Sequence, residues 1–160
     1  MDKIGFGGGC HWCTEAVFQI LKGVNKVEQG WIASNGEYDS LSEAVIVHFD
    51  STIIELDTLI EIHLHTHSCT SQHPKRKKYR SAVYVFSDFQ LEKTKQIICN
   101  LQSDFELPII TQALPFLSFK KNIEQYQNYY LKNSENQFCQ TYIGPKFRLL
   151  MQKFARLIET

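Results

Sequence analysis

The sequence lacks a net charge, and it lacks long apolar runs. Its 17 lysine and arginine residues are balanced by 17 aspartate and glutamate residues, so no overall field would gather the protein onto nucleic acid, a membrane surface or an acidic substrate. The first residues lead directly into glycine and cysteine, and no apolar segment is long enough for a signal-peptide core or a membrane span. We therefore expect a cytoplasmic protein whose partner is small or local, with no nucleic acid and no membrane.

Internal repeats and low-complexity linkers are also missing. The chain has 160 residues and 43% hydrophobic content, which is enough to bury one sizeable core but too short for us to expect two. We expect a single domain over residues 1–160. The cysteines are odd in number, which fits reduced thiols with a catalytic use better than a secreted disulfide framework. They are Cys10, Cys13, Cys69, Cys99 and Cys139.

The hydrophobic pattern changes between strand and helix periods along the chain. Apolar residues at helical spacing predict helices, and short runs rich in β-branched and aromatic residues predict strands. Residues 53–65 fit a helix, although their isoleucine and threonine content leaves a strand open. The predicted elements are strands over 3–6, 24–34, 43–49, 81–86 and 107–111, and helices over 11–22, 53–65, 90–102, 120–132 and 147–158.

The first six predicted elements run strand, helix, strand, strand, helix, strand. This is the split β-α-β order of ferredoxin-like folds, which builds a mixed sheet with helices packed on it. We therefore predict an α+β fold with such a sheet and additional C-terminal helices. Because the same fold serves many functions, the chemistry has to be inferred from the site.

Cys10 stands where a glycine loop is expected to turn into a helix, in the segment Gly7-Gly8-Gly9-Cys10-His11-Trp12-Cys13. The free amides and positive dipole end of a helix N-terminus favour a thiolate, and glycines let a substrate approach the backbone closely. Cys13 is close enough for a disulfide across the first helical turn. The alternative, half of a zinc site, lacks a second Cys-x-x-Cys or a His-x-x-x-His at zinc-finger spacing. The motif therefore predicts a redox centre with Cys10 as the nucleophile.

Metal binding by the histidine-rich segment 62–69 is a second interpretation. On a helix, His63 and His67 would share a face at metal-ligand spacing, and on a strand His65 would join them. Cys69 and His73 could complete the ligand set. Histidines at the margin of a polar loop are more often solvated than bound to metal, so we favour the redox interpretation.

Further segments along the chain carry distinctive patterns beside the cysteine motif. They are Gly9–Cys13 with Glu15 and Phe18, Leu21–Val24, Gly30–Ala33, Glu43–Asp50, Tyr79–Tyr84, Glu124–Asn133 and Phe138–Lys146. Taken in order, these segments resemble the peptide methionine sulfoxide reductase A family over almost the whole chain. The resemblance implies a peptide-methionine (S)-S-oxide reductase-like enzyme, an oxidoreductase that repairs methionine after oxidative stress.

The resemblance also implies a role for each matching site residue. It makes Cys10 the nucleophile, Glu43 the proton donor to the sulfoxide oxygen and Tyr79 a second donor. A sulfoxide sulfur becomes open to attack only as its oxygen gains a proton, so the site needs a carboxyl kept protonated by a dry, aromatic setting. The side chains expected to line the substrate pocket are Trp12, which would hold the methyl group, and His11 and Trp31.

Attack by Cys10 would expel the thioether and leave a sulfenic acid, which a nearby thiol condenses to a disulfide. That thiol could come from Cys13 or from Cys139, which lies where the family often carries a resolving cysteine. We expect Cys10–Cys13 to form first, because the shorter loop costs less entropy, and Cys139 at most to relay it. Thioredoxin or another dithiol would reset the enzyme, and no metal or bound cofactor is needed. Cys69 and Cys99 should stay free thiols, with Cys99 in the core.

Three departures separate this chain from the family pattern. The family's phenylalanine beside the nucleophile is His11, its pocket tyrosine is Trp31, and its Gly-Asn-Asp-Val-Gly-Thr-Gln loop is replaced by the shorter segment 72–78. The aspartate of that loop has no counterpart here. The substrate could therefore be methionine sulfoxide in proteins, the free amino acid or a different small-molecule sulfoxide.

The run Lys75-Arg76-Lys77-Lys78 lies inside this replaced loop. A nucleic-acid patch would need aromatic residues interleaved with the charges, and none is present. Four basic residues on a neutral chain are usually a solvated loop, although here they could also draw in an anionic substrate.

Overall fold

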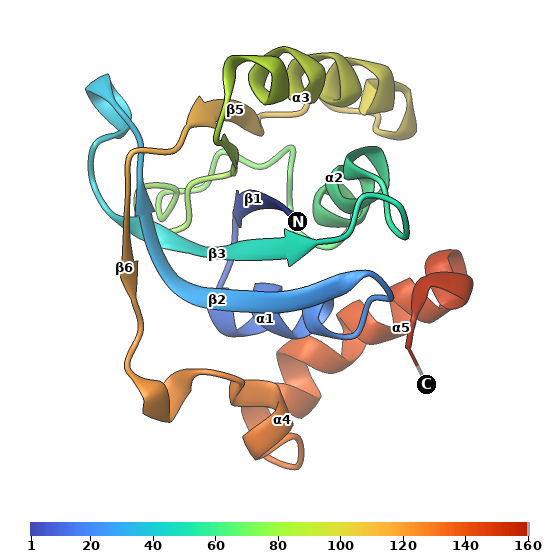
Figure 1. The fold of residues 1–160 in the computed structure, drawn as a ribbon. Coiled ribbons are helices and arrows are strands. Elements are labelled where there is room, and N and C mark those ends of the chain that lie inside the picture. The colour runs from blue at the N-terminus through green and yellow to red at the C-terminus, as the bar shows by residue number, and fades with distance from the viewer. Residues whose placement is uncertain (160) are drawn as a thin grey trace.

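The computed structural model describes residues 1–159 and has a six-stranded mixed sheet at its centre (Figure 1). The four middle strands are antiparallel to one another, β5 runs parallel to β4, and β6 runs antiparallel to β2. The order β4-β1-β3-β2 confirms the predicted split β-α-β arrangement and the α+β class. In spatial order the strands are β5 (Gln112–Pro115), β4 (Ala82–Val85), β1 (Asp2–Gly7), β3 (Ser42–Phe49), β2 (Val24–Ala33) and β6 (Ser118–Lys121).

The helices pack around this sheet and against one another. The first of them begins directly after the three glycines, and Gly23, with a positive φ of 91°, follows its end. None of the helices in residues 1–159 combines the length and the apolar character needed to cross a membrane. The helices are α1 (His11–Gln19), α2 (Leu56–His65), α3 (Asp88–Leu101), α4 (Tyr129–Asn133) and α5 (Gly144–Phe154).

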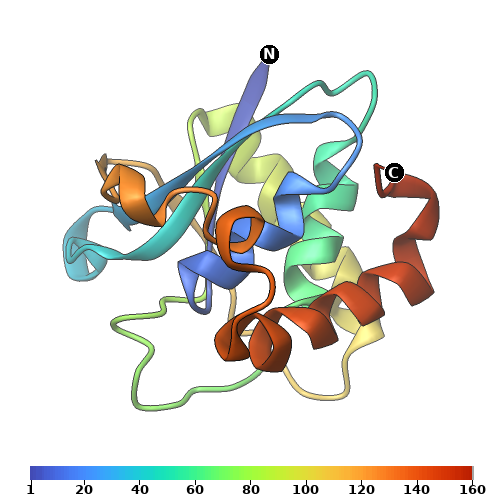
Figure 2. The same cartoon turned by 90° about the horizontal axis from the view of Figure 1, so that it is seen from below.

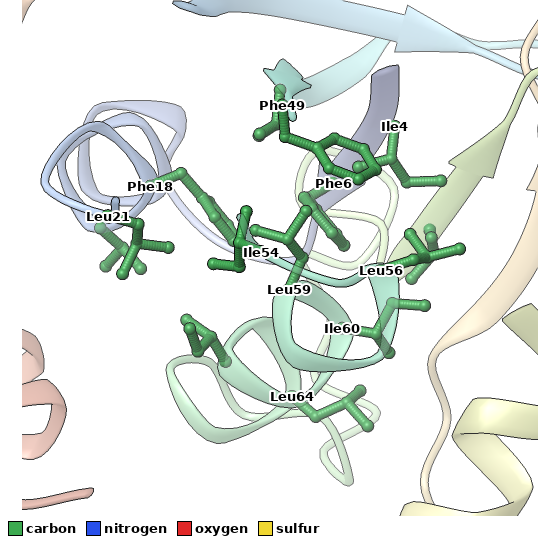
Figure 3. Packing of buried hydrophobic residues seen from close by; sticks show 14 of the residues in the cluster. Ile4, Phe6, Phe18, Leu21, Phe49, Ile54, Leu56, Leu59, Ile60 and Leu64 are labelled. Carbon is green, nitrogen blue, oxygen red and sulfur yellow. The ribbon is translucent and has the colours of Figure 1, made fainter. Parts of the chain in front are cut away.

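The period-two pattern of β3 divides the core between the two faces of the sheet. Val45, Val47 and Phe49 belong to the main cluster with α1 and α2, whereas Ala44 and Ile46 belong to a smaller cluster on the other face. Figure 3 shows side chains of the strands and of the two helices meeting in the main cluster. Glu43 continues the helix-facing row of β3, which places it under the start of α1.

The structure differs from the sequence-based expectation between α3 and α4. Residues 107–111, predicted as a strand, are irregular, and β5 begins only at Gln112. The predicted helix over 120–132 is replaced by β6, a 3-10 turn at Glu124–Tyr126 and the short α4. Asn128, with a φ of 56°, stands between that turn and α4, and a continuous right-handed helix cannot include such a residue.

A buried glutamate ties the C-terminal segment to α1. The Glu15 carboxylate accepts hydrogen bonds from the backbone N–H groups of Asn128 (2.9 Å) and Tyr129 (3.0 Å) and from the side-chain amide of Gln29 (2.9 Å). Burial raises the pKa of Glu15, and these hydrogen bonds oppose that shift. The segment that carries α4 is thereby fixed beside α1, as Figure 2 shows.

Candidate active site

Cys10 lies half-buried at the junction between the glycine loop and α1. A hydrogen bond from the Cys13 thiol lowers the pKa of the Cys10 thiol, and the backbone N–H groups of Trp12 and Cys13 add to this effect. Burial and the negative charge of Glu43 act in the opposite direction, but the pKa remains below its usual value. Cys10 is therefore the cysteine that the site favours as a thiolate.

Cys13 has the opposite character. It is buried one helical turn along α1, and its pKa is raised because its thiol donates to Cys10 and because the site is desolvated. The hydrogen bond between the two thiols therefore favours ionisation of Cys10 over ionisation of Cys13. Cys13 is a free thiol next to Cys10, and the role of Cys10 as the nucleophile stays a prediction.

Cys139 also reaches this neighbourhood, although it is far away in sequence. It is 1% exposed and packs in one cluster with Cys13, Ala16 and Ile143, with Cys10 against its edge. Cys139 opens a short π-helical segment, Cys139–Ile143, directly before α5. The structure therefore brings together all three cysteines that were predicted to take part in the redox chemistry.

The two remaining cysteines lie elsewhere in the molecule. Cys69 lies in the turns that follow α2 and is buried in the main hydrophobic cluster. Cys99 was predicted to be a core residue beside Ile97 and Ile98, and this prediction was wrong: its position on α3 is exposed. Only one residue of that part of α3, Ile97, is buried, so the helix presents a narrower apolar face than its sequence indicated.

Lys146 is a site residue that the sequence did not single out. Its ammonium donates to the backbone carbonyl of Thr66, and burial lowers its pKa, while the thiolate forms of Cys13 and Cys10 act to raise it. The charge of Lys146, on α5, in turn acts to lower the pKa of Cys13. A positive charge at this position favours the ionised form of a nearby sulfur.

Glu43 and His11 form a buried polar pair beside Cys10. The Glu43 carboxylate, 7% exposed, accepts a hydrogen bond from the His11 backbone N–H (3.2 Å), and His11 Nε2 lies 3.5 Å from Glu43 Oε1. His11 Nδ1 lies 2.7 Å from the Gly30 carbonyl oxygen, which can only accept, so Nδ1 carries the hydrogen. Burial lowers the pKa of His11, while the hydrogen bond to Gly30 and the charge of Glu43 act in the opposite direction.

The surroundings of Glu43 are less apolar than predicted, because Lys78 approaches it from the replaced loop. Lys78 Nζ lies 3.7 Å from Glu43 Oε2 and 5.1 Å from the centre of the Tyr79 ring. A hydrogen bond to Tyr79, followed by the charges of Tyr79 and Glu43, raises the pKa of Lys78. Both predicted proton donors, Glu43 and Tyr79, thus share one cationic neighbour.

The two tryptophans contact different groups of side chains. Trp12 stacks on Tyr129 with ring centres 4.0 Å apart, and Phe138 meets it edge-on at 5.3 Å. Trp31 instead meets the His11 ring at 5.1 Å. The aromatic wall around Trp12 therefore comes largely from the C-terminal segment, which the sequence did not indicate.

Arg76 does not behave as part of a solvated charge run. Its guanidinium donates to four backbone carbonyls, at distances between 2.6 and 2.9 Å. Two of them matter most for the site: Gly8, in the glycine loop before the nucleophile, and Tyr79, the predicted second donor. The others belong to Ser68 and Ser71 in the same outer loop. Arg76 therefore joins the loop of Cys10 to the loop of Tyr79.

Replacing Arg76 by methionine should destabilise the fold by about 2 kcal/mol, because several charged hydrogen bonds to backbone oxygens are lost. Sulfoxide turnover should fall further than stability alone explains, since the loops of Cys10 and Tyr79 lose their common tie. Urea denaturation and turnover at a temperature where the variant is folded would measure both effects. Lys77→Met, in the exposed part of the same run, is the matched control. Equal behaviour of the two variants would contradict the role of Arg76.

The histidine-rich segment does not form the metal-ligand set considered from the sequence. His63 Nε2 lies 2.9 Å from the Gly7 carbonyl, and His67 lies between the His63 carbonyl and the Ser81 hydroxyl, with His67 Nε2 2.8 Å from Ser81 Oγ. His65 points elsewhere and pairs with Asp104 at 3.1 Å. Burial holds the pKa of His63 well below its usual value and lowers that of His67 to about 3. These two histidines are uncharged supports beneath the glycine loop.

Comparison with known proteins identifies the wider group to which this site belongs. The family model described as peptide methionine sulfoxide reductase matches residues 2–157. The chain belongs to the peptide methionine sulfoxide reductase family. Among curated relatives of this family, the enzyme MsrA from Pasteurella multocida is 33% identical over 166 residues, which cover 95% of each chain. MsrA from Chromobacterium violaceum is 29% identical and covers 99% of each chain.

Solved structures show the same fold. Mxr1 from Saccharomyces cerevisiae in an unusual oxidised form is 26% identical, with a TM-score of 0.71 over 88% of this chain and 86% of that one. Methionine sulfoxide reductase A of Corynebacterium diphtheriae is 22% identical, with a TM-score of 0.73 over 84% and 76% of the two chains. As a member of the peptide methionine sulfoxide reductase family, the chain is an oxidoreductase.

Proposed function

We propose that this protein reduces methionine sulfoxide, in proteins or as the free amino acid, to methionine, with Cys10 as the nucleophile. The observation that carries the proposal is the lowered pKa of the Cys10 thiol directly beside the buried Glu43 carboxyl. A nucleophilic sulfur and a proton donor for the sulfoxide oxygen are the two groups that the reaction needs. A sulfoxide of another small molecule is the alternative substrate.

The proposed first step joins these two groups. The Cys10 thiolate attacks the sulfoxide sulfur while Glu43, with Tyr79 as a second donor, supplies protons to the sulfoxide oxygen. The oxygen then passes to Cys10, the thioether leaves, and Cys10 is oxidised to a sulfenic acid. Trp12 and Trp31, together with His11, would line the pocket for the substrate, and the His11 backbone N–H would also orient Glu43.

The second step removes the oxygen as water. A thiol condenses with the Cys10 sulfenic acid to form a disulfide, and an external dithiol then reduces that disulfide. All electrons come from thiols, so the proposed cycle requires no metal and no bound organic cofactor. We propose a thioredoxin-like protein as the reductant. A related fold supports this choice, because Mxr1 from Saccharomyces cerevisiae has been solved in complex with Trx2. That structure is 23% identical to this chain, with a TM-score of 0.63 over 80% of this chain and 84% of that one.

A turnover screen tests this function. Purified protein should reduce peptide-bound and free methionine sulfoxide when dithiothreitol or thioredoxin with its reductase is supplied. Dimethyl sulfoxide and aryl sulfoxides, offered in parallel, test the alternative substrate class. Failure to reduce any sulfoxide, with Cys10 shown to be reduced, would refute the proposal.

The order of disulfide formation is a separate prediction. We expect Cys10–Cys13 to form first, because the Cys13 thiol already donates a hydrogen bond to Cys10, and Cys139 at most to relay the disulfide afterwards. Rapid alkylation and peptide mapping after one turnover without reductant would identify the first disulfide. The Cys13→Ser variant is the informative control, since only Cys139 could then resolve the sulfenic acid. A Cys10–Cys139 disulfide that appears in the unaltered protein without an earlier Cys10–Cys13 species would contradict the order.

A further inference from the structure

The replaced loop places a lysine at the mouth of the proposed site with its backbone fixed and its side chain largely exposed. The Lys78 carbonyl accepts hydrogen bonds from the Glu43 backbone N–H and from the Ser42 hydroxyl, both at 2.9 Å. The Lys78 side chain is nevertheless 62% exposed. Its position is thus determined by β3, while its ammonium remains open to a ligand from solvent.

Within residues 1–159, Glu43 is the one carboxylate within ion-pair distance of Lys78, with Oε2 3.7 Å from Nζ. In the proposed reaction Glu43 must carry a proton in order to deliver it to the sulfoxide oxygen. A protonated Glu43 is uncharged, so Lys78 then has no anionic partner from the described chain at the moment when substrate is bound. An ammonium has three donors, and a substrate anion would fill the vacant position.

A second lysine approaches from the other side of Trp31. Glu43 on β3, Trp31 on β2 and Lys120 on β6 are directly paired across three neighbouring strands, so their side chains project from the same face of the sheet. Lys120 Nζ lies 5.7 Å from the centre of the Trp31 ring, and Lys120 is exposed. Two lysines therefore stand on either side of the Glu43 and Trp31 surface.

We infer that Lys78, supported by Lys120, binds the α-carboxylate of the substrate, so that the preferred substrate is a methionine sulfoxide with a free carboxylate. In such a residue only Cγ, Cβ and Cα separate the sulfur from the carboxylate, so a sulfur held at Cys10 keeps the anion near the two lysines. A methionine sulfoxide inside a peptide carries no charge at that position. The inference rests on the proposed sulfoxide reduction and adds the class of substrate.

Paired substrates test the inference. N-acetylmethionine sulfoxide carries the carboxylate, and its N-methylamide is the same molecule without the charge. For the unaltered protein, kcat/KM should be about fivefold higher for the acid than for the amide, as an exposed ion pair allows. In Lys78→Met the ratio of kcat/KM for acid over amide should fall to about one, whereas Lys78→Arg should keep most of the preference for the acid. Added salt should reduce this preference in the unaltered protein. Lys77→Met, in the same loop, should leave the ratio unchanged.

The ratio of kcat/KM for the acid and the amide separates recognition of the carboxylate from a general effect of the Lys78 substitution on Glu43. A substitution that disturbs Glu43 should slow the reduction of both substrates alike. Equal rates for the acid and the amide in the unaltered protein would overturn the inference, and so would a preference for the acid that persists in Lys78→Met. In either case, reduction of the amide would still support the proposed function. If neither substrate is reduced, the proposed function falls and the inference with it. The carboxylate could belong to the free amino acid or to the C-terminal residue of a peptide, and free methionine sulfoxide, which has an additional ammonium group, distinguishes these two sources. A rate equal to that of the N-acetyl acid indicates the free amino acid, and a lower rate indicates a C-terminal residue.

Discussion

Replacing Cys10 by serine should reduce sulfoxide turnover to background, a loss of about a thousandfold or more, because a hydroxyl at this position is neither ionised nor a sulfur nucleophile. The fold should survive the change. Cys10 is the N-cap residue of α1 and makes no side-chain capping hydrogen bond, whereas serine is a preferred N-cap. The thermal midpoint of Cys10→Ser should therefore equal or slightly exceed that of the unaltered protein.

Cys99→Ser provides the matched control for this experiment. Cys99 is an exposed thiol on α3, outside the cysteine cluster of the site, so its loss should change neither turnover nor stability. Turnover and thermal unfolding would be measured on both variants under one reductant. Sulfoxide reduction that persists in Cys10→Ser would remove Cys10 from the role of nucleophile.

Replacing Glu43 by glutamine should slow the chemical step by about a hundredfold or more, with a much smaller effect on substrate binding, because an amide cannot deliver a proton to the sulfoxide oxygen. Glutamine keeps the size of the side chain, and its carbonyl oxygen can still accept from the His11 backbone N–H. The single-turnover rate at saturating substrate measures the chemical step directly.

Glu28→Gln is the corresponding control, because Glu28 lies on β2 and pairs with His48 at 2.6 Å, outside the site. Its single-turnover rate should match that of the unaltered protein. A Glu43→Gln variant with an unchanged rate would mean that another group protonates the substrate, and Tyr79 would then be the next residue to replace.

The first half of the fold could be predicted because its pattern is strong. In β3, alternate residues enter two different hydrophobic clusters, so the period of two is visible in the sequence itself. The strands β5 and β6 carry no such signal. Each has four residues at an edge of the sheet, and β6 reads Ser-Phe-Lys-Lys, so its assignment depends on backbone pairing with β2 rather than on its side chains.

The same distinction applies to the site. Cys10 and Glu43 stand on elements that the sequence predicts, and their neighbourhood follows from the pairing of β1 with β3 and from the start of α1. Arg76 and Lys78 belong to a charge run that resembles a solvated loop. Only the folded chain shows that Arg76 binds backbone carbonyls inward while Lys78, two residues later, remains largely exposed beside Glu43.

The two edges of the sheet also affect how another protein can approach. An exposed strand edge can pair with a strand of another chain, but β5 ends in proline, which has no amide hydrogen, and β6 carries Lys120 and Lys121. Both edge strands are short, so neither offers a long row of unpaired backbone groups. Growth of the sheet by strand addition is therefore discouraged at both ends, which protects against edge-to-edge aggregation. We therefore expect the proposed reductant to approach over the side chains around α1 and the C-terminal segment, without extending the sheet.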